Sequence, residues 1–292
     1  MKYRHSFHAG NFADVHKHVA LLALLRALKK KDKGFLYLDT HAGRGSYDLS
    51  GGSAEAAAGV GRFLQAQHAA PELTEYASLV TQFRAGTVRR QLYPGSPLIA
   101  ASELRAQDRA VMIELQGAEA HALEESLEAL AAARGGGLAA RVERGDGWAR
   151  LRAFLPPPER RGLTFVDPPY EDTQQDFDNV TTAMAEAARR FPTGLLAVWY
   201  PIKDERTLAP WQAECLRALH GAAASPPAVL ASELWLYPRD SRVALNGSGL
   251  LIVNPPWLTL ERMQVWVPEL QGCLAVGPGG GTSVRMLSES AR

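Results

Sequence analysis

The sequence Asp167-Pro168-Pro169-Tyr170 joins a carboxylate, two rigid prolines and an aromatic ring at the end of the apolar run 163–167. Because neither proline has an N–H group, the backbone around the Pro168 carbonyl is fixed and poor in donors. Asp167 and this carbonyl can therefore both accept hydrogen bonds from one exocyclic amine, while Tyr170 offers a flat face on which an extruded base stacks. The motif predicts a clamp for the N6 amine of an adenine, with Asp167, Pro168 and Tyr170 as catalytic residues.

Methyl transfer is the reaction that such a clamp favours. The lone pair of an adenine N6 is delocalised into the ring, so the amine is a poor nucleophile. Two acceptors that draw on its N–H bonds pyramidalise the nitrogen and aim the lone pair at a methyl group. A rigid turn after a strand would explain the two prolines alone, but not the whole set.

The segment from Asp39 to Gly45 directly follows the apolar run 35–39. Gly43 and Gly45 allow a sharp turn and a close approach of a ligand to the backbone. The full Gly-x-Gly-x-x-Gly pattern of nicotinamide-binding loops is absent. A strand that ends in aspartate and continues into a shorter Gly-x-Gly loop fits S-adenosylmethionine (SAM) better, although a tight structural turn explains this loop equally well.

Two further carboxylates stand at the ends of predicted strands. Glu114 ends the second strand, where an acid can accept both hydroxyls of a ribose. Asp146, followed by Gly147, ends the third strand, where an acid can bind the amino group of an adenine. Each acid alone could cap the next helix. Together with Asp39 they favour one crevice, because the carboxyl ends of parallel strands meet at the same edge of a sheet.

Short apolar runs alternate with amphipathic helical patterns along the chain. Seven of these runs are predicted strands: 35–39, 111–115, 140–143, 163–167, 195–200, 229–237 and 250–254. Strands separated by helices indicate a parallel sheet that is covered on both faces. The predicted fold class is α/β, a Rossmann-like SAM-dependent methyltransferase with a seven-stranded, mostly parallel sheet and a small helical insertion.

The interval between the first and second strands contains two helical patterns, which we assign to an insertion, residues 51–94. A further helix should begin at Ser96-Pro97, with Ser96 as its N-cap. We therefore divide the chain into three parts: a basic N-terminal extension and helix (1–33), the Rossmann-like domain (34–50 and 95–292) and the helical insertion (51–94).

The end of the chain carries two more features. Asn254-Pro255-Pro256-Trp257 repeats the shape of the first Pro-Pro motif, but it follows a late strand that should lie further from the cofactor. We assign it a structural role. The glycine-rich tail from Gly277 is predicted to be a loop or a mobile terminus.

Composition and charge bound the class of protein. The 292 residues are 46% hydrophobic and 22% charged, which excludes intrinsic disorder. Two cysteines cannot form a disulfide framework or a four-thiolate zinc site, and no apolar stretch is long enough to span a bilayer. We expect a cytoplasmic protein that does not enter a membrane.

Positive charge is concentrated at the start of the chain. The net charge is +1, yet residues 1–33 hold eight Lys and Arg against two Asp. This excess fits contact with a phosphate backbone, and it equally fits a solvated helix end that complements the helix dipole. Within it, Val15, Val19, Leu22, Leu25 and Leu28 recur at the spacing of an amphipathic helix.

Several motifs together carry a family resemblance. The chain opens with Tyr3-Arg-His-Ser-Phe-His-Ala-Gly-Asn11, and it continues with Phe35–Gly43, Tyr93–Pro97, Asp167–Tyr170, Trp199–Pro201 and Asn254–Trp257. These segments closely resemble the RlmJ family of SAM-dependent 23S rRNA adenine-N6 methyltransferases, the adenine 2030 enzymes. The likeness runs nearly from end to end, and the opening motif is far more specific than Asp-Pro-Pro-Tyr alone.

The resemblance implies roles for individual residues. The residues that would contact SAM are His18, His41, Ser96, Glu114, Asp146, Gly147 and Asp167. Tyr3 would lie near the mouth of the active site and contact the target RNA. Lys17, beside His18, is a weaker candidate for the active-site pocket. Phe12, His16 and Gln116-Gly117 depart from the family pattern outside the expected chemistry.

The resemblance and the residues together predict transfer of a methyl group from SAM to N6 of an adenine in 23S rRNA. The partner would be the rRNA, no metal would be needed, and the balanced net charge is compatible with a monomer. Three alternatives remain at this point: a DNA adenine-N6 methyltransferase, a protein glutamine methyltransferase, and a non-catalytic rRNA-binding assembly factor.

Overall fold

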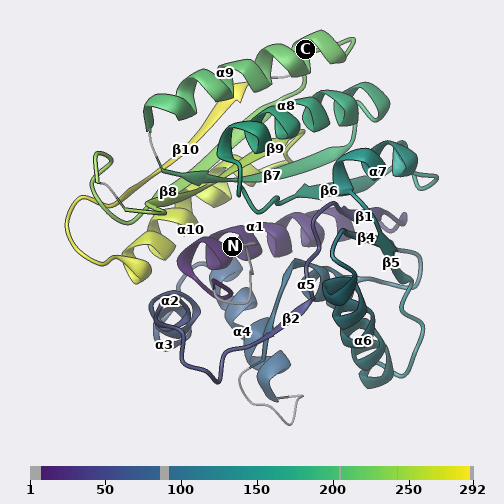
Figure 1. Cartoon of the computed structure of the whole chain (residues 1–292), viewed down its shortest axis with the longest axis horizontal. Helices are drawn as coiled ribbons and strands as arrows, with labels where there is room; N and C mark the ends of the chain where they lie inside the picture. Colours follow the sequence, from purple (N-terminus) through teal and green to yellow (C-terminus); the bar gives the residue numbers. More distant parts are fainter. Residues whose placement is uncertain (1–7, 86–91, 204, 242, 290–292) are drawn as a thin grey trace.

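An eight-stranded sheet runs through the middle of the molecule (Figure 1). The computed structural model describes residues 8–85, 92–203, 205–241 and 243–289. The strands in spatial order are β10 (Gly281–Ser288), β8 (Val229–Trp235), β9 (Gly247–Val253), β7 (Leu195–Ile202), β6 (Gly162–Val166), β1 (Leu36–Asp39), β4 (Arg109–Glu114) and β5 (Ala140–Arg144).

The neighbouring strands β5, β4, β1, β6 and β7 are parallel, whereas β9 pairs antiparallel with both β7 and β8. The parallel strands therefore end at one edge of the sheet, and Asp39, Glu114, Asp146 and Asp167 come to that edge. We call it the carboxyl edge. The predicted Rossmann-like, mostly parallel sheet is confirmed.

The number of strands was predicted wrongly. An eighth strand, β10, pairs antiparallel with β8 where we expected a loop or a mobile terminus. Its side chains are half-buried or exposed on both faces, so the sequence has no alternating apolar pattern that would signal a strand. Pairing with β8 and an ion pair between Arg285 and Glu233 (2.9 Å) hold it to the sheet.

Helices cover both faces of this sheet (Figure 1). The apolar core on one face includes residues of α1 (Phe12–Lys29), α4 (Pro71–Ala85), α5 (Ser96–Glu103), α6 (Gly117–Ala133) and α10 (Thr259–Leu274). The core on the other face includes residues of α7 (Gly147–Phe154), α8 (Thr173–Arg190) and α9 (Glu205–Ala222). The predicted layering of helices on both faces is therefore present.

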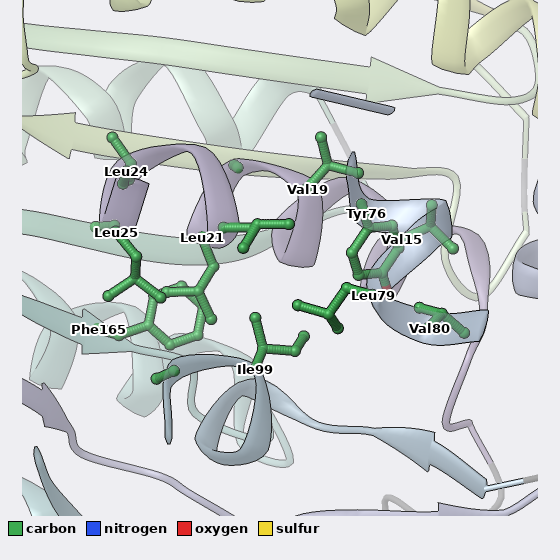
Figure 2. Packing of buried hydrophobic residues seen from close by; sticks show 14 of the residues in the cluster. Val15, Val19, Leu21, Leu24, Leu25, Tyr76, Leu79, Val80, Ile99 and Phe165 are labelled. Atoms are coloured by element: carbon green, nitrogen blue, oxygen red, sulfur yellow. The ribbon is translucent and has the colours of Figure 1, made fainter. Parts of the chain in front are cut away.

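Helix α1 is more buried than an amphipathic surface helix. Figure 2 shows its apolar side chains gathered with Phe165 of β6 and with residues of α4 and α5. Because this helix is enclosed by the sheet and other helices, its polar residues are buried as well: Asp14, His16, Lys17 and His18 are each at most 4% exposed. The predicted helix is present, but its first two turns bury their polar residues and are not amphipathic.

The segment 51–94 contains α2 (Ala54–Ala56), a π-helical turn (Ala57–Gly61), α3 (Arg62–Gln65), α4 and β3 (Leu92–Pro94). Strand β3 pairs antiparallel with β2 (Ser46–Asp48), which lies outside the main sheet. The chain therefore leaves and re-enters the main fold at one place. The division into domains stays a prediction.

The second Pro-Pro motif lies far from the first. Because β9 runs antiparallel to β7, Asn254 follows β9 at the edge opposite the carboxyl edge. The Asn254 side-chain amide donates to the carbonyls of Pro192 and Gly194, at 2.8 Å each. These bonds fasten the loop before β7 and support the structural role that we assigned to this motif.

Within the part of the chain that the structure describes, no helix is both long and apolar enough to cross a membrane.

The contact between Arg285 and Glu233 tests how β10 is held. Glu233 is 2% exposed and also accepts from Tyr200 and Gln212, so Arg285→Ala removes the cation but leaves these two donors. We expect a loss of about 1–3 kcal/mol in the free energy of unfolding, measured by urea denaturation. Arg217→Ala, at an exposed position of α9, is the control. Equal losses in the two variants would contradict this role of Arg285.

Candidate active site

Asp167 directly follows β6 and pairs with a buried lysine from α1. The Lys17 ammonium Nζ lies 2.5 Å from Asp167 Oδ2 and 2.8 Å from Asp14 Oδ1. Burial alone would lower the pKa of Lys17, but the two carboxylates outweigh it and raise that pKa above its ordinary value. Lys17 is therefore a permanent cation that links the start of α1 to the Asp-Pro-Pro-Tyr motif.

Hydrogen bonds in the first turn of α1 position Asp14, the second carboxylate that contacts Lys17. Asn11 is the N-cap, and its side-chain oxygen accepts from the Asp14 N–H at 3.0 Å. Asp14 Oδ2 accepts from the Gly10 N–H at 2.8 Å. These bonds hold the Asp14 carboxylate where it meets Lys17, one helical turn further on.

The acceptors predicted for an amine are available. No described residue donates to Asp167 Oδ1 or to the Pro168 carbonyl oxygen, and the Asp167 side chain is 12% exposed. Lys17 thus occupies one carboxylate oxygen and leaves the other open. This arrangement agrees with an acceptor pair at the carboxyl edge.

Tyr170 has a different setting from the one we expected. Its backbone is left-handed (φ 51°), its hydroxyl donates to the Trp199 carbonyl at 2.7 Å, and its side chain is 4% exposed. The ring packs against Phe177 and edge-on against Trp199. A base can stack on Tyr170 only where these neighbours leave the ring uncovered, so the stacking role stays a prediction.

Trp199 joins the lysine and the tyrosine. Its indole ring lies 5.3 Å from Lys17 Nζ, and its Nε1–H donates to Ser248 Oγ at 2.9 Å. His16 Nδ1 is 2.9 Å from the same oxygen, and burial lowers the pKa of His16 to about 3. A neutral His16 therefore helps to fix Trp199 beneath Lys17.

Asp39 lies at the end of β1 and is fully buried. Its carboxylate accepts from Tyr37 Oη (2.7 Å), Ser96 Oγ (2.8 Å) and the His41 N–H (3.1 Å). Burial raises the pKa of Asp39 to about 6, against the opposing effect of these donors. Ser96 was expected to cap α5, but Gly95 is the N-cap and Ser96 instead ties α5 to β1.

Glu114 is hydrogen-bonded to the loop that follows β1. Glu114 Oε2 accepts from the Gly43 N–H at 2.8 Å, and Oε1 accepts from the Gln116 N–H at 2.7 Å. Burial raises the pKa of this carboxyl, and the two backbone donors oppose the shift. Each carboxylate oxygen has lone pairs beyond these bonds, so ribose hydroxyls can still be accepted.

Asp146 and Gly147 begin α7 at the same edge. Asp146 is exposed and caps the helix by accepting from the Trp148 N–H at 2.9 Å. Gly147 packs so closely on Thr40 that a side chain there would collide with the Thr40 carbonyl. The His41 ring meets Trp148 edge-on at 4.5 Å, so the β1 loop and the start of α7 are in contact.

One predicted residue, His18, has its contacts away from this group. His18 Nδ1 is 2.8 Å from Tyr93 Oη and 3.4 Å from Tyr76 Oη, and the side chain is 2% exposed. It therefore belongs to a buried contact among α1, β3 and α4. Tyr3 lies outside the described residues.

The chemistry of this edge fits SAM. Glu114 and exposed Asp146 are acceptors on adjacent strands, and the Asp39–Gly45 loop lies beside them with backbone conformations of positive φ at Gly43 and Gly45. These are acceptors for ribose hydroxyls and an adenine amino group, with close backbone on one side. The fold and the site define a SAM-dependent methyltransferase.

Comparison with known proteins identifies the family. The family model described as "Ribosomal RNA large subunit methyltransferase D, RlmJ" matches residues 32–287. The chain is 38% identical to Ribosomal RNA large subunit methyltransferase J of Escherichia coli, over 97% of this chain and 98% of that protein. The Haemophilus influenzae protein of the same name is 35% identical over 99% of both chains.

A solved structure agrees with this. Protein LPL1258 of Legionella pneumophila is 34% identical and superposes with a TM-score of 0.81, covering 95% of this chain and 98% of that one. The chain belongs to the RlmJ family of ribosomal RNA large subunit methyltransferases.

Asp39 gives a pH-dependent prediction. The unfolded chain loses this proton near pH 3.8 and the folded chain near pH 6, so ionisation of Asp39 destabilises the fold as pH rises between these values. A shift of this size corresponds to about 3 kcal/mol. Asp39→Asn cannot ionise, so its free energy of unfolding should improve relative to the wild type by up to about 3 kcal/mol between pH 4 and pH 7.

Urea denaturation at a series of pH values measures this difference. Asp178→Asn, at an exposed position of α8, is the control for the loss of a surface carboxyl. A difference between wild type and Asp39→Asn that stays constant from pH 4 to pH 7 would contradict the raised pKa of Asp39.

Proposed function

We propose that the protein transfers a methyl group from SAM to N6 of an adenine in 23S rRNA, adenine 2030 by family resemblance. The products are N6-methyladenosine and S-adenosylhomocysteine. One observation carries the choice of atom: Asp167 Oδ1 and the Pro168 carbonyl oxygen lie next to each other in sequence with no described donor. The RNA class is supported by the names of the relatives.

Asp167 and Pro168 act on the amine. Two acceptors take the two N6–H bonds and turn the nitrogen lone pair towards the methyl carbon. The N–C bond forms as the S–C bond breaks, and the surplus proton on N6 passes to the Asp167 carboxylate and then to solvent. Catalysis comes mainly from proximity and orientation of the two reactants.

Lys17 keeps the clamp in one geometry. It holds Asp167 Oδ2 while its own position is set by Asp14 and by the face of Trp199. The open Oδ1 is therefore presented at one fixed place. Lys17 is a positioning residue in this proposal, since it acts through Asp167.

SAM supplies an electrophilic methyl group on a sulfonium. We assign its ribose to Glu114 and its adenine to Asp146 and Gly147, with His18, His41, Ser96 and Asp167 as the further contacts that the resemblance implies. In the present structure Ser96 bonds to Asp39 and His18 to Tyr93, so their contact with SAM requires these bonds to be shared or exchanged.

The remaining parts of the proposal concern the setting. The enzyme acts on 23S rRNA in the cytoplasm as a monomer and without a metal ion. In the described ranges of the chain, no three His, Cys, Asp or Glu side chains gather in a way that could hold a metal.

A methyl-transfer assay with labelled SAM tests the proposal. Unmodified 23S rRNA, duplex DNA and a release-factor protein are offered in parallel, and the modified product is identified by mass spectrometry. We expect N6-methyladenosine in the rRNA alone. Label in DNA or protein would contradict the proposal that rRNA is the substrate. Absence of both methyl transfer and SAM binding would favour the alternative that the protein is a non-catalytic assembly factor.

Asp167→Asn tests the clamp. The variant keeps the shape of the side chain but has a single acceptor oxygen. Lys17 holds that oxygen, so a donor NH2 group faces the substrate amine and can accept neither an N6–H bond nor the proton that leaves N6. We expect the single-turnover rate to fall at least about 100-fold, with circular dichroism unchanged. Asp178→Asn is the control, and a folded Asp167→Asn variant with near wild-type turnover would refute the clamp.

Tyr3→Ala tests the RNA contact that the resemblance implies. Loss of the ring should raise KM for the RNA more than about tenfold and leave the Kd for SAM within about twofold. Kinetics with varied RNA and calorimetry with SAM give the two values. Equal losses in both would contradict the assignment of Tyr3 to RNA.

A further inference from the structure

The lysine run at the end of α1 lies at the edge of the sheet opposite the active site. Residues 30–33, which we call the lysine turn, follow α1 and precede β1, while Asp39 and Asp167 lie at the other ends of β1 and β6. The positive charge of the N-terminal segment is therefore divided. Lys17 lies beside Asp167, and Lys30, Lys31 and Lys33 lie at the far edge.

The lysine turn is held by two arginines from neighbouring loops. The Arg105 guanidinium donates to the carbonyls of Lys29 (3.2 Å), Lys31 (3.1 Å) and Lys33 (3.4 Å). The Arg161 guanidinium donates to the carbonyls of Leu28 (2.7 Å) and Lys33. These bonds fix the turn. Arg105 is itself paired with the buried Asp108 at 2.8 Å, so of the two arginines Arg161 is the one that adds unbalanced positive charge beneath the turn.

The side chains of the turn are free to meet a ligand. Lys30, Lys31 and Lys33 are exposed, and none of them makes an ion pair with a described residue. Arg160, in the loop before β6, is exposed as well. Together with Arg161 beneath the turn, these side chains form a compact cationic surface, which we call the lysine platform.

Acidic groups near the lysine platform are mostly engaged elsewhere. Glu103 pairs with Lys29 and Arg26, and Glu159 pairs with Arg109. Asp108 is buried and neutralises Arg105, so that pair adds no net charge. Asp32, within the turn, is the exposed acid and lies beside the Gln107 amide. The local excess of positive charge is therefore not cancelled at the surface.

The dipole of α1 does not explain why the lysines lie in a turn that other loops hold in place. Lysines that merely complement the end of α1 would act from the last helical turn. Here Lys31 and Lys33 lie beyond the helix, and their backbone is fixed by side chains from two other loops. The arrangement presents charge outward from a rigid base.

We propose that the lysine platform binds the phosphate backbone of a double-stranded stem of the rRNA substrate, away from the target adenine. The inference rests on the proposed function for the identity of the RNA. Contact with phosphates needs cations but no base recognition, and duplex RNA is bound largely through its backbone and shape.

The absence of stacking residues favours a duplex over single-stranded RNA. Proteins that bind single strands interleave cations with exposed aromatic rings. In the described part of the chain, the large exposed apolar side chains are Leu115, Tyr237, Trp257, Leu258, Val265 and Val276. None of these belongs to the lysine turn or to the loops of Arg105 and Arg161.

The length of the sheet sets how far the RNA must reach. Lys33 and Asp39 are six residues apart through β1, which is about 20 Å in an extended strand. Helix α1 spans the same interval, from Lys17 beside Asp167 to the start of the lysine turn. An RNA that occupies both places must extend at least this far from the target base, so a short substrate cannot reach the platform.

Lys31→Gln with Lys33→Gln is the test variant, because both residues lie outside α1. Arg152→Gln with Arg217→Gln is the control, since it removes the same charge from exposed positions on α7 and α9. Each protein is assayed with a short hairpin around the target adenine and with a long transcript that retains the flanking stems. Equilibrium binding of the same RNAs is measured from 50 to 300 mM salt.

We expect the test variant to bind the long transcript on the order of tenfold more weakly, with the slope of log K against log salt reduced by about two. Its KM for the long transcript should rise in parallel. The rate on the short hairpin, the Kd for SAM and the melting temperature should not change, and the control should behave as the wild type.

Three results would overturn the platform: unchanged binding of the long transcript, equal effects on both RNAs, or equal effects of the test and control pairs. The binding measurement is independent of catalysis. If the wild type binds these RNAs but methylates neither, the proposed function fails. The salt dependence of binding by the wild type and the test variant still shows whether the lysine platform contacts the RNA.

Discussion

The buried contact of Lys17 with Asp14 and Asp167 is the constraint on which the active site depends. A charge removed from water is stable only when it is paired, and breaking a buried pair costs several kcal/mol. Lys17 is 4% exposed, so the start of α1 has to meet the end of β6 wherever this chain folds. The same contact leaves one oxygen of Asp167 without a described donor, and the proposed mechanism gives that oxygen to the substrate amine. In this account Oδ2 of Asp167 stabilises the fold through Lys17, and Oδ1 serves the reaction.

The rest of the architecture keeps that contact dry and in place. Helix α1 packs against α4 and α5 as well as against the sheet, and the pairing of β2 with β3 brings the inserted segment back to its point of departure. Trp199, fixed through Ser248 and His16, closes the site from the β7 side. At the carboxyl edge, Glu114 and Asp39 hold the loop that the cofactor approaches.

Much of the fold and part of the site could be predicted from the sequence. Long apolar runs ending in Asp39, Glu114 and Asp167 indicate a parallel sheet with acids at one edge, because that pattern is local. The ion pair of Lys17 could not be predicted, since it joins residues 150 positions apart. Strand β10 gave no apolar alternation, and the bond from Ser96 to Asp39 was hidden because serine before proline also suits a helix cap.

The central claim is that Lys17 sets the catalytic geometry through Asp167. Single-turnover methyl transfer by Lys17→Gln and Lys17→Arg, with SAM and RNA saturating, tests it most directly. The account predicts a loss of about 100-fold or more for folded Lys17→Gln with nearly normal SAM affinity, and partial recovery in Lys17→Arg, which retains the cation. A folded Lys17→Gln variant that transfers methyl at the wild-type rate would contradict it.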